Sequence, residues 1–295
     1  MYALRRFGII LGLDTIKNIL SALGNPQNDY NCIHIAGTNG KGSVASSLSA
    51  ILHESGYRVG LYTSPHLVRF NERICINNRQ IANKDVVKSY QAVKRVHHGD
   101  RSPTFFEFST AMALYTFSSQ RVDWAVIETG MGGRYDATNI IRPAISIITN
   151  VSMEHRDYLG NTLAKIAREK AGIIKQATPV VTAVKQKPAR SVVREVARKK
   201  SAPLFMLGRD FRVRRDRPGH FSYYGYANTW RHLKTPLLGR YQVQNAALAL
   251  AAGELLLGNG VAITHESIKQ GLANTRWPGR LELVCDRPLV ILDGA

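Results

Sequence analysis

The chain has 295 residues, of which 44% are hydrophobic and 21% charged, which is typical of a globular protein with one large core or two smaller ones. It carries 40 lysines and arginines against 21 aspartates and glutamates, and a net charge of +19 favours contact with polyanions. The three cysteines fall in no paired spacing, which indicates a reducing compartment, and the sequence contains no run of 18 apolar residues, which excludes a predicted membrane-spanning helix.

The N-terminal segment only weakly resembles a signal peptide. Arg5 and Arg6 precede the apolar stretch 7–13, but Asp14 and Lys17 interrupt it and no small-residue cleavage site follows. We therefore expect a cytoplasmic protein.

Short β-rich stretches then alternate with helical ones. The predicted strands are 32–37, 59–64, 124–129, 144–150 and 179–183, and the predicted helices are 44–55, 107–119, 162–174 and 188–200. This alternation predicts an α/β fold, a P-loop-type central and mostly parallel sheet with helices on both faces. Polar and aromatic stretches between 203 and 236 predict a small antiparallel excursion, and further helices are predicted at 241–257 and 264–273.

The last stretch, "PLVILDGA" at 288–295, reads as the first strand of another domain. We expect a first domain at 1–287 and the start of a second at 288–295. Because 31–274 contains a complete alternating pattern, the first domain should fold alone. The tail would then have no sheet to join and would be left exposed or loosely pinned.

A glycine-rich turn, "GTNGKG" at 37–42, separates a predicted strand from a predicted helix that we expect to begin at Ser43. Such a turn surrounds an anion with backbone N–H groups and a helix N-terminus, and Lys41 would reach the outer phosphates of a nucleotide. Ile35 replaces the first glycine of the common phosphate loop, and a plain turn with a surface lysine is the alternative. The predicted nucleotide contacts are Thr38, Asn39, Gly40, Lys41, Gly42 and Ser43.

Six spaced motifs give the whole chain a resemblance to one family. They are "GTNGKGS" at 37–43, "LYTSPHLVRFNERI" at 61–74, "FEF" at 106–108, "VIETGMGGRYDATN" at 126–139, "EKAGI" at 169–173 and "RWPGRLE" at 276–282. The chain resembles the folylpolyglutamate synthase and dihydrofolate synthase family, ATP-dependent amide ligases related to the Mur ligases, and we expect the fold of the Mur ligase central domain. The resemblance implies that ATP phosphorylates a carboxylate of dihydropteroate or a reduced folate. The amine of L-glutamate then attacks the acyl phosphate, with Mg²⁺ as cofactor, in a protein that we expect to be a monomer.

Glu128 ends the apolar strand "WAVIE", where parallel sheets bind ligands, and is the predicted magnesium ligand. An acid that caps the following turn is the alternative. The resemblance adds Ser64 and His155 as metal ligands, although oxygen ligands dominate magnesium chemistry and His155 could equally serve only as a hydrogen-bonding residue. It also implies that Lys170 carries a carboxylated amine, against a surface lysine paired with Glu169. The predicted catalytic set is Lys41, Glu128, His155 and Lys170.

The resemblance places the pterin-bearing substrate against the loop 64–74. The residues expected to contact it are His66, Arg69, Phe70, Arg73 and Phe106, with plain hydrophobic anchoring as the alternative for the two phenylalanines. Asn245, Arg280 and Asp293 match family residues near the nucleotide, and the fork of Arg280 suits a phosphate.

The chain departs from the family pattern at its end. Family members continue "DGAHN" into a second α/β domain, whereas the sequence stops at Ala295. We therefore expect a truncated or fragmentary ligase with impaired activity. A non-catalytic nucleotide- or nucleic-acid-binding remnant is one alternative. A Mur-type peptide ligase is another, and the loop 64–74 argues against it.

The positive charge is densest at 184–217, which holds twelve basic and three acidic residues. We interpret this segment as a solvated helix face and hairpin, because no nucleic-acid-binding motif accompanies it. No specific nucleic-acid partner and no membrane partner are expected.

Overall fold

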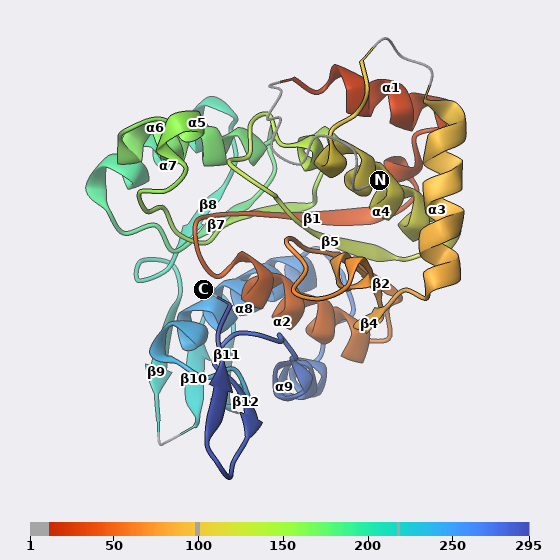
Figure 1. Cartoon of the computed structure of the whole chain (residues 1–295). Helices are drawn as coiled ribbons and strands as arrows, with labels where there is room; N and C mark the ends of the chain where they lie inside the picture. Colours follow the sequence, from red (N-terminus) through yellow and green to blue (C-terminus); the bar gives the residue numbers. More distant parts are fainter. Residues whose placement is uncertain (1–11, 98–100, 217–218, 295) are drawn as a thin grey trace.

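The computed structural model describes residues 12–97, 101–216 and 219–294. Its centre is an eight-stranded sheet in the order β4-β3-β2-β5-β1-β6-β7-β8 (Figure 1). The strands are β1 (Asn31–Ala36), β2 (Val59–Tyr62), β3 (Ile74–Ile76), β4 (Arg79–Gln80), β5 (Trp124–Glu128), β6 (Ile145–Ile148), β7 (Val180–Thr182) and β8 (Leu204–Met206). The six strands from β2 to β8 in that order run parallel, and β3 and β4 add an antiparallel edge. The Arg5–Arg6 segment and Ala295, on which two expectations rested, lie outside the described residues.

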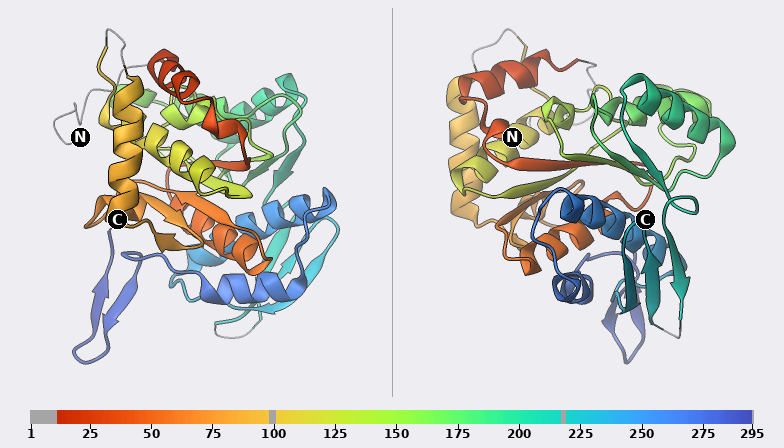
Figure 2. Two further views of the ribbon diagram at one scale, coloured as in Figure 1. Left: turned by 90° about the vertical axis from the view of Figure 1, so that its right-hand side faces the viewer. Right: turned by 180° about the vertical axis from the view of Figure 1, so that it is seen from behind.

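Helices cover both faces of this sheet, as the alternating pattern predicted (Figure 2). They are α1 (Asp14–Ala22), α2 (Lys41–Glu54), α3 (Asn83–Val96), α4 (Phe105–Ser119), α5 (Arg156–Leu159), α6 (Leu163–Lys170), α7 (Lys187–Lys199), α8 (Arg240–Gly258) and α9 (His265–Asn274). Short 3₁₀ turns stand at η1 (Pro26–Asn28), η2 (Phe70–Arg73), η3 (Ala137–Ile140) and η4 (Ala171–Ile173). The predicted α/β fold is confirmed.

The side chains of β1 show which helices cover which face of the central sheet. Ile33 and Ile35 are buried in one cluster with residues of α2, α8 and α9, whereas Cys32 is buried with residues of α1 and α4 and Ala36 with residues of α6 and α7. Successive side chains of a strand point to opposite faces, so β1 separates the two layers. Both faces are buried, which explains why the central strands are continuous apolar runs such as "WAVIE".

The predicted antiparallel excursion exists but begins later than expected. β9 (Arg212–Arg215), β10 (Phe221–Tyr224) and β11 (Thr229–Leu233) form a three-stranded antiparallel sheet. The prediction was wrong for Leu204–Met206, because this stretch runs parallel to β7 as the edge strand β8 of the central sheet. α7 returns the chain to that edge, as a parallel connection requires.

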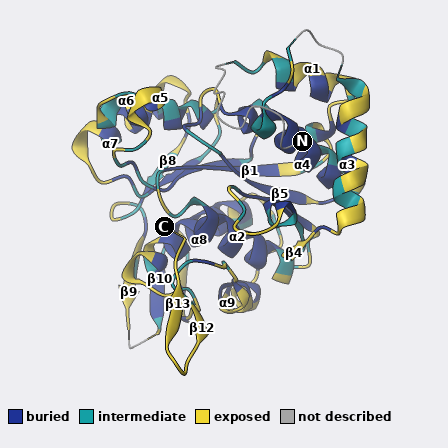
Figure 3. Cartoon of the chain, viewed as in Figure 1, coloured by how far each residue is buried: buried dark blue, intermediate teal, exposed yellow. Residues whose placement is uncertain are grey.

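The C-terminal stretch forms a hairpin of its own. β12 (Glu282–Cys285) pairs antiparallel with β13 (Val290–Leu292), a pairing that we did not predict. The expectation that the tail joins no sheet of the first domain and is left exposed is confirmed. The two strands join neither of the other sheets, and all their residues except Glu282 are exposed, with Val284 60% and Ile291 49% accessible (Figure 3). The domain boundary that we place between 287 and 288 falls within this hairpin and stays a prediction. Among the described helices, none combines the length and apolar character that a membrane crossing needs.

Candidate active site

The glycine-rich turn lies at the carboxyl end of β1 and leads directly into α2. The helix begins at Lys41, two residues before the predicted start at Ser43, and Gly40 stands at its N-cap with a φ of 83°. A Cβ at Gly40 would lie 2.5 Å from Asn245 Oδ1 of α8, so this position needs glycine for both conformation and space. Asn245 thus lies against the turn, and its contact with the nucleotide stays a prediction.

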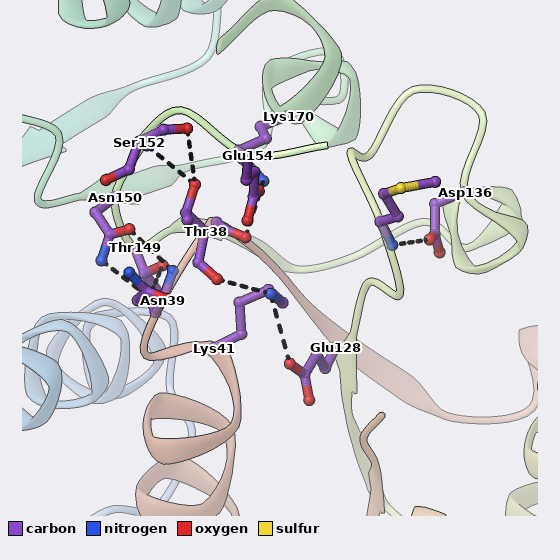
Figure 4. Close-up of polar contacts among 12 residues, drawn as sticks. Thr38, Asn39, Lys41, Glu128, Asp136, Thr149, Asn150, Ser152, Glu154 and Lys170 are labelled. Atoms are coloured by element: carbon purple, nitrogen blue, oxygen red, sulfur yellow. Dashed lines mark hydrogen bonds and ion pairs between the residues drawn. The ribbon is translucent and has the colours of Figure 1, made fainter. Parts of the chain in front are cut away.

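The residues that follow β6 form the second wall of the turn (Figure 4). Asn39 donates its backbone N–H to Asn150 Oδ1 at 3.0 Å, and its carbonyl accepts hydrogen bonds from Thr149 Oγ1 at 2.7 Å and Asn150 Nδ2 at 2.9 Å. The hydroxyl oxygen of Thr38 accepts from the backbone N–H of Ser152 at 3.0 Å. Two adjacent parallel strands therefore fix the shape of the turn, which preorganises it for an anion.

Lys41 points from the turn towards the end of β5. Its Nζ donates to the carbonyl of Thr38 at 3.1 Å and lies 3.9 Å from Glu128 Oε1 (Figure 4). Only 16% of the lysine side chain and 5% of the glutamate side chain are accessible to solvent. Lys41 is therefore not a plain surface lysine, which was the alternative interpretation of the turn. The pair places a cation and an anion together at the carboxyl edge of the sheet.

The carboxylate of Glu128 is buried at the end of β5. Burial raises the pKa of this carboxyl to about 7, against the opposing effects of Lys41 and of the Ser64 N–H, which donates to Oε2 at 3.2 Å. A divalent cation would offset the cost of burying this charge, and carboxylate and hydroxyl oxygens are ligands that magnesium accepts. Glu128 and Ser64 therefore fit the predicted magnesium site.

His155 does not join this pair in the structure. It is exposed, stands at the N-cap of α5 with a φ of 43°, and makes no contact with Glu128 or Ser64 among the described residues. Across residues 12–97, 101–216 and 219–294, no group of three or more His, Cys, Asp and Glu side chains could hold a metal ion by itself. The assignment of His155 as a metal ligand stays a prediction.

Lys170 is buried, which contradicts the alternative of a surface lysine paired with Glu169. Its side chain is 2% accessible, and its Nζ donates to the Gly37 carbonyl at 2.9 Å and forms an ion pair with Glu154. Burial lowers the pKa of the amine, and the charge of Glu154 opposes this shift. Glu154 was not predicted as a site residue, although it directly precedes His155 in the sequence.

The loop after β2 is held together by one carboxylate. The backbone N–H groups of Leu67, Val68 and Arg69 all donate to Glu72, at 2.6, 3.0 and 2.6 Å. The Arg69 side chain itself is exposed. Sequence reasoning missed Glu72, because its role depends on three backbone groups rather than on a pattern of side chains.

A cluster of rings and cations lies next to this loop. Arg73 Nε donates to His66 Nδ1 at 2.7 Å, and the Arg73 guanidinium lies 5.1 Å from the ring centre of Phe105. Phe70 packs edge-on against both His66 and Phe105, at 6.3 and 6.2 Å. The structure thus brings together three of the predicted substrate residues, His66, Phe70 and Arg73, and adds Phe105.

Phe106 packs against the segment that follows β5. A Cβ at Gly130 would meet the Phe106 ring at 2.5 Å, and the ring centre lies 6.1 Å from that of Tyr62. Asp136, which sequence reasoning missed, closes this segment by accepting the backbone N–H groups of Met131 at 2.9 Å and Thr138 at 3.0 Å. The acid is visible in the motif "GRYDATN", but no spacing rule predicts that it accepts these two backbone N–H groups.

The remaining predicted nucleotide residues come from the end of the chain. Arg280 Nη1 lies 3.9 Å from Asp293 Oδ1, and the charge of Arg280 also acts on Glu128. Trp277, a further missed residue, lies under the start of α2, because a Cβ at Gly42 would meet its ring at 2.2 Å. α8 and the segment around Trp277, both remote in the sequence, therefore lie against the turn, and Arg280 lies near enough to Glu128 for its charge to act on it.

Comparisons with known proteins agree with this geometry. Residues 35–253 match the model of the Mur ligase middle domain. The chain is 39% identical to the dihydrofolate synthase/folylpolyglutamate synthase of Bacillus subtilis, over 98% of this chain and 70% of that protein. A solved FPGS–AMPPCP–folate complex superposes with a TM-score of 0.94 at 38% identity, over 100% of this chain and 74% of the other. E. coli FolC in complex with DHPP and ADP gives 0.90 at 33% identity, over 99% and 68%.

Proposed function

The chain belongs to the dihydrofolate synthase/folylpolyglutamate synthase branch of the Mur ligase family, and from this premise we propose that it is an ATP-dependent amide ligase. Its acceptor is dihydropteroate, a reduced folate or both, and its second substrate is L-glutamate. The reaction transfers the terminal phosphoryl group of ATP to a carboxylate of the acceptor. The glutamate amine then attacks the acyl phosphate, phosphate leaves, and an amide bond forms.

One observation carries the proposal. Lys41 extends from the preorganised turn towards the buried Glu128, so that a cation and a carboxylate flank the place where nucleotide phosphates would lie. The ATP analogue and ADP in the two structural relatives support a nucleotide there. Phosphoryl transfer needs little covalent chemistry from a protein, and positioning with charge neutralisation is what this arrangement supplies.

We propose that Glu128 and Ser64 hold the magnesium ion, which neutralises phosphate oxygens when it is bound. Lys41 then exchanges its weak contact with Glu128 for a phosphate oxygen. Thr38, Asn39, Gly40, Gly42 and Ser43 provide the cradle, and Arg280 and Asp293 approach it from the end of the chain. The buried Lys170–Glu154 pair would fix the Gly37 carbonyl at the start of the cradle. The carboxylated Lys170 that the family resemblance implies is a separate proposal, because a carbamate is an anion and would have to replace the ion pair with Glu154.

The acceptor site is proposed between the loop 64–74 and Phe106. Folate and DHPP in the structural relatives support a pterin-bearing ligand. Phe70, Phe105 and Phe106 offer ring faces and edges, and the His66–Arg73 pair offers polar contacts. Exclusion of water by these rings would protect the acyl phosphate from hydrolysis. We further propose that the protein acts as a cytoplasmic monomer.

The test is incorporation of labelled glutamate into dihydropteroate and tetrahydrofolate. The chain spans 70% of the B. subtilis relative, so the assay uses the chain alone and the chain continued after Ala295 by the matching part of that relative. In the active form, Lys41→Ala and Glu128→Gln should each lower turnover by roughly 100- to 1,000-fold, because a contact to developing charge contributes about 3 to 4 kcal/mol.

Lys94→Ala serves as the matched control, because Lys94 lies exposed at the end of α3 opposite to Asn83, the residue of this helix that contacts the loop 64–74. It should keep the wild-type rate. Turnover within tenfold of wild type in Lys41→Ala or Glu128→Gln would overturn the site assignment. ATP binding without incorporation in either form would favour a nucleotide-binding remnant.

A further inference from the structure

Two side-chain amides stand near the start of α8, the helix that lies against the nucleotide turn. Gln242 and Asn245 are three residues apart, which places them on one face of the helix. α8 packs against α2, and Asn245 meets the turn at Gly40 (Figure 1). Asn245 is a predicted nucleotide contact, whereas Gln242 has no role in the proposed function.

The side chain of Gln242 is buried, but only one end of its amide is hydrogen-bonded. The residue is 1% accessible to solvent. Its Oε1 accepts a hydrogen bond from Asn245 Nδ2 at 2.9 Å, whereas its Nε2 has no hydrogen-bond partner among the residues that the structure describes. Buried amides are normally hydrogen-bonded at both ends, so this unpaired donor is unfavourable for the folded chain.

The Asn245 amide turns its carbonyl end towards the turn. A Cβ at Gly40 would lie 2.5 Å from Asn245 Oδ1. The oxygens of a nucleotide phosphate are hydrogen-bond acceptors, and a carbonyl oxygen directed at them repels them. The NH₂ group of the same side chain would instead donate to them. The direction of this amide therefore decides whether Asn245 opposes or favours a phosphate.

The two amides have a second arrangement of the same shape. If each amide exchanges the positions of its oxygen and nitrogen, Gln242 Nε2 donates to Asn245 Oδ1, and Asn245 Nδ2 faces the turn. The hydrogen bond between the two side chains is kept. The unpaired buried atom becomes a carbonyl oxygen, which proteins tolerate better than an unpaired N–H group. A phosphate in the turn would favour this second arrangement, because it interacts differently with the two.

We propose that Gln242 is a positioning residue for the nucleotide, and that it acts by setting the direction of the Asn245 amide. Without a nucleotide, Gln242 accepts a hydrogen bond from Asn245. With a nucleotide in the turn, Gln242 donates to Asn245 Oδ1 and holds Nδ2 towards a phosphate oxygen. This role rests on the proposed function, because it requires a nucleotide in the turn.

A double-mutant cycle tests whether Gln242 acts through Asn245. Titration calorimetry measures the affinity of the chain for the ATP analogue AMPPCP in the presence of Mg²⁺. We expect Gln242→Met to weaken this affinity at least fourfold and Asn245→Ala at least tenfold. In the Asn245→Ala chain, adding Gln242→Met should change the affinity less than twofold, because no amide is left to orient. Equal fold-changes in both backgrounds would overturn the proposal.

Gln244→Met is the matched control on the same helix. Gln244 is exposed, and its Oε1 accepts a hydrogen bond from Lys185 Nζ at 3.2 Å. The same substitution at this position should leave the affinity within twofold of wild type. The melting temperature of Gln242→Met should not fall, because methionine has a similar volume and removes the unpaired donor. A lowered melting temperature with unchanged affinity would make Gln242 a structural residue and contradict the proposal.

Side-chain amide signals in ¹⁵N NMR spectra follow the reversal directly. The Gln242 signal, identified by its loss in Gln242→Met, should shift when AMPPCP saturates the wild-type chain, and it should not shift in Asn245→Ala. An unmoved signal in the saturated wild type would exclude the reversal.

Failure of the proposed function itself gives a different result. A wild-type chain that binds no AMPPCP would overturn both the nucleotide site and the role of Gln242. Binding that is insensitive to Asn245→Ala would overturn only the role of Gln242 and leave the nucleotide site in place.

Discussion

His34 is a fully buried residue of β1 whose two ring nitrogens differ sharply in their surroundings. Nε2 lies 2.8 Å from Thr138 Oγ1, while Nδ1 is buried without a hydrogen-bond partner among the described residues. Burial, together with the charge of Lys175, lowers the pKa of His34 to about 3. The ring therefore stays neutral in the folded protein at any moderate pH, and it links β1 to the segment that Asp136 closes.

This depressed pKa predicts a stability that depends on pH. The unfolded chain takes up a proton near pH 6.5, whereas folded His34 resists it down to about pH 3, so stability falls as the pH drops through this window. His34→Gln should remove this part of the dependence. From pH 7.5 to 5 its unfolding free energy, relative to wild type, should rise by about 2 kcal/mol in urea titrations.

His265→Gln, at the exposed start of α9, provides the control and should follow the wild-type curve. If the unfolding free energies of His34→Gln and wild type differed by the same amount at every pH in this range, this would contradict the prediction that the buried ring stays neutral.

Residues with recognisable chemistry could be predicted from the sequence more reliably than the residues that they contact. Lys41 and Glu128 could be predicted, because a glycine-rich turn and a strand-ending acid each follow from local pattern. Asn150 and Trp277 could not, since each contacts the turn from a segment that is remote in the sequence. Glu154 could not either, because its partner is the buried Lys170. Only the fold determines which distant polar group satisfies a given backbone atom.

At the scale of elements, one buried carboxylate joins α8 to the small sheet. Glu254 is fully buried and accepts hydrogen bonds from Tyr223 Oη at 2.7 Å, from the backbone N–H of Tyr226 at 3.2 Å and from that of Ala227 at 3.0 Å. The backbone and side-chain N–H groups of Asn228 donate to it as well. This carboxylate caps the turn between β10 and β11 in the way that a bound anion would.

Glu254→Gln should therefore destabilise the protein although it preserves the shape of the side chain. An NH₂ group would replace an oxygen that faces N–H donors, and lost hydrogen bonds to a charged group cost about 2 to 4 kcal/mol. Urea unfolding measures the loss. Glu266→Gln on the exposed face of α9 should stay within about 0.5 kcal/mol of wild type. A comparably small effect at Glu254 would show that the turn does not depend on the charge.

Element prediction succeeded where burial dominates the sequence. The parallel strands are apolar on both faces, and the helices α2, α4, α7 and α8 were located within a few residues. β3, β4, α1 and α3 were missed, because they are short or lie at the periphery. β8 was assigned to the wrong sheet and β12 was missed, because both depend on which strand they pair with, and local sequence pattern does not contain this information.

For the whole molecule, about half of the net charge comes from residues 184–217, which hold twelve basic and three acidic residues. α7 presents Arg190, Arg194 and Arg198, with Lys187 and Lys199 on the same helix, and we name this the basic surface. β9 adds three arginines, but it belongs to the small antiparallel sheet. Glu195 of α7 pairs with Arg168 and Lys199 and leaves the three arginines of the basic surface without this partner. The basic surface lies on a helix that does not build the nucleotide turn.

Any binding of duplex DNA should accordingly be diffuse and sensitive to salt. If the basic surface makes about six phosphate contacts, the affinity should fall roughly 1,000-fold between 50 and 200 mM salt in filter binding. Replacing Arg190, Arg194 and Arg198 by glutamine should reduce the logarithmic salt slope by up to about 2.7. ATP binding should change far less over the same series, because the Lys41 and Glu128 side chains are largely shielded from solvent and their charges are screened less by salt. Sequence-selective DNA binding that persists at high salt would contradict a merely solvated surface.

The contacts of Gly40 with Asn245 and of Gly42 with Trp277 also constrain how the protein matures on the ribosome. The turn and α2 emerge early, whereas the two residues that pack against them follow more than 200 positions later. At about 5 to 20 residues per second, roughly 10 to 40 seconds of synthesis separate these events. Until α8 and the segment around Trp277 have left the exit tunnel, the nascent turn lacks one of its walls, so its nucleotide-binding shape is completed only after translation has passed Trp277.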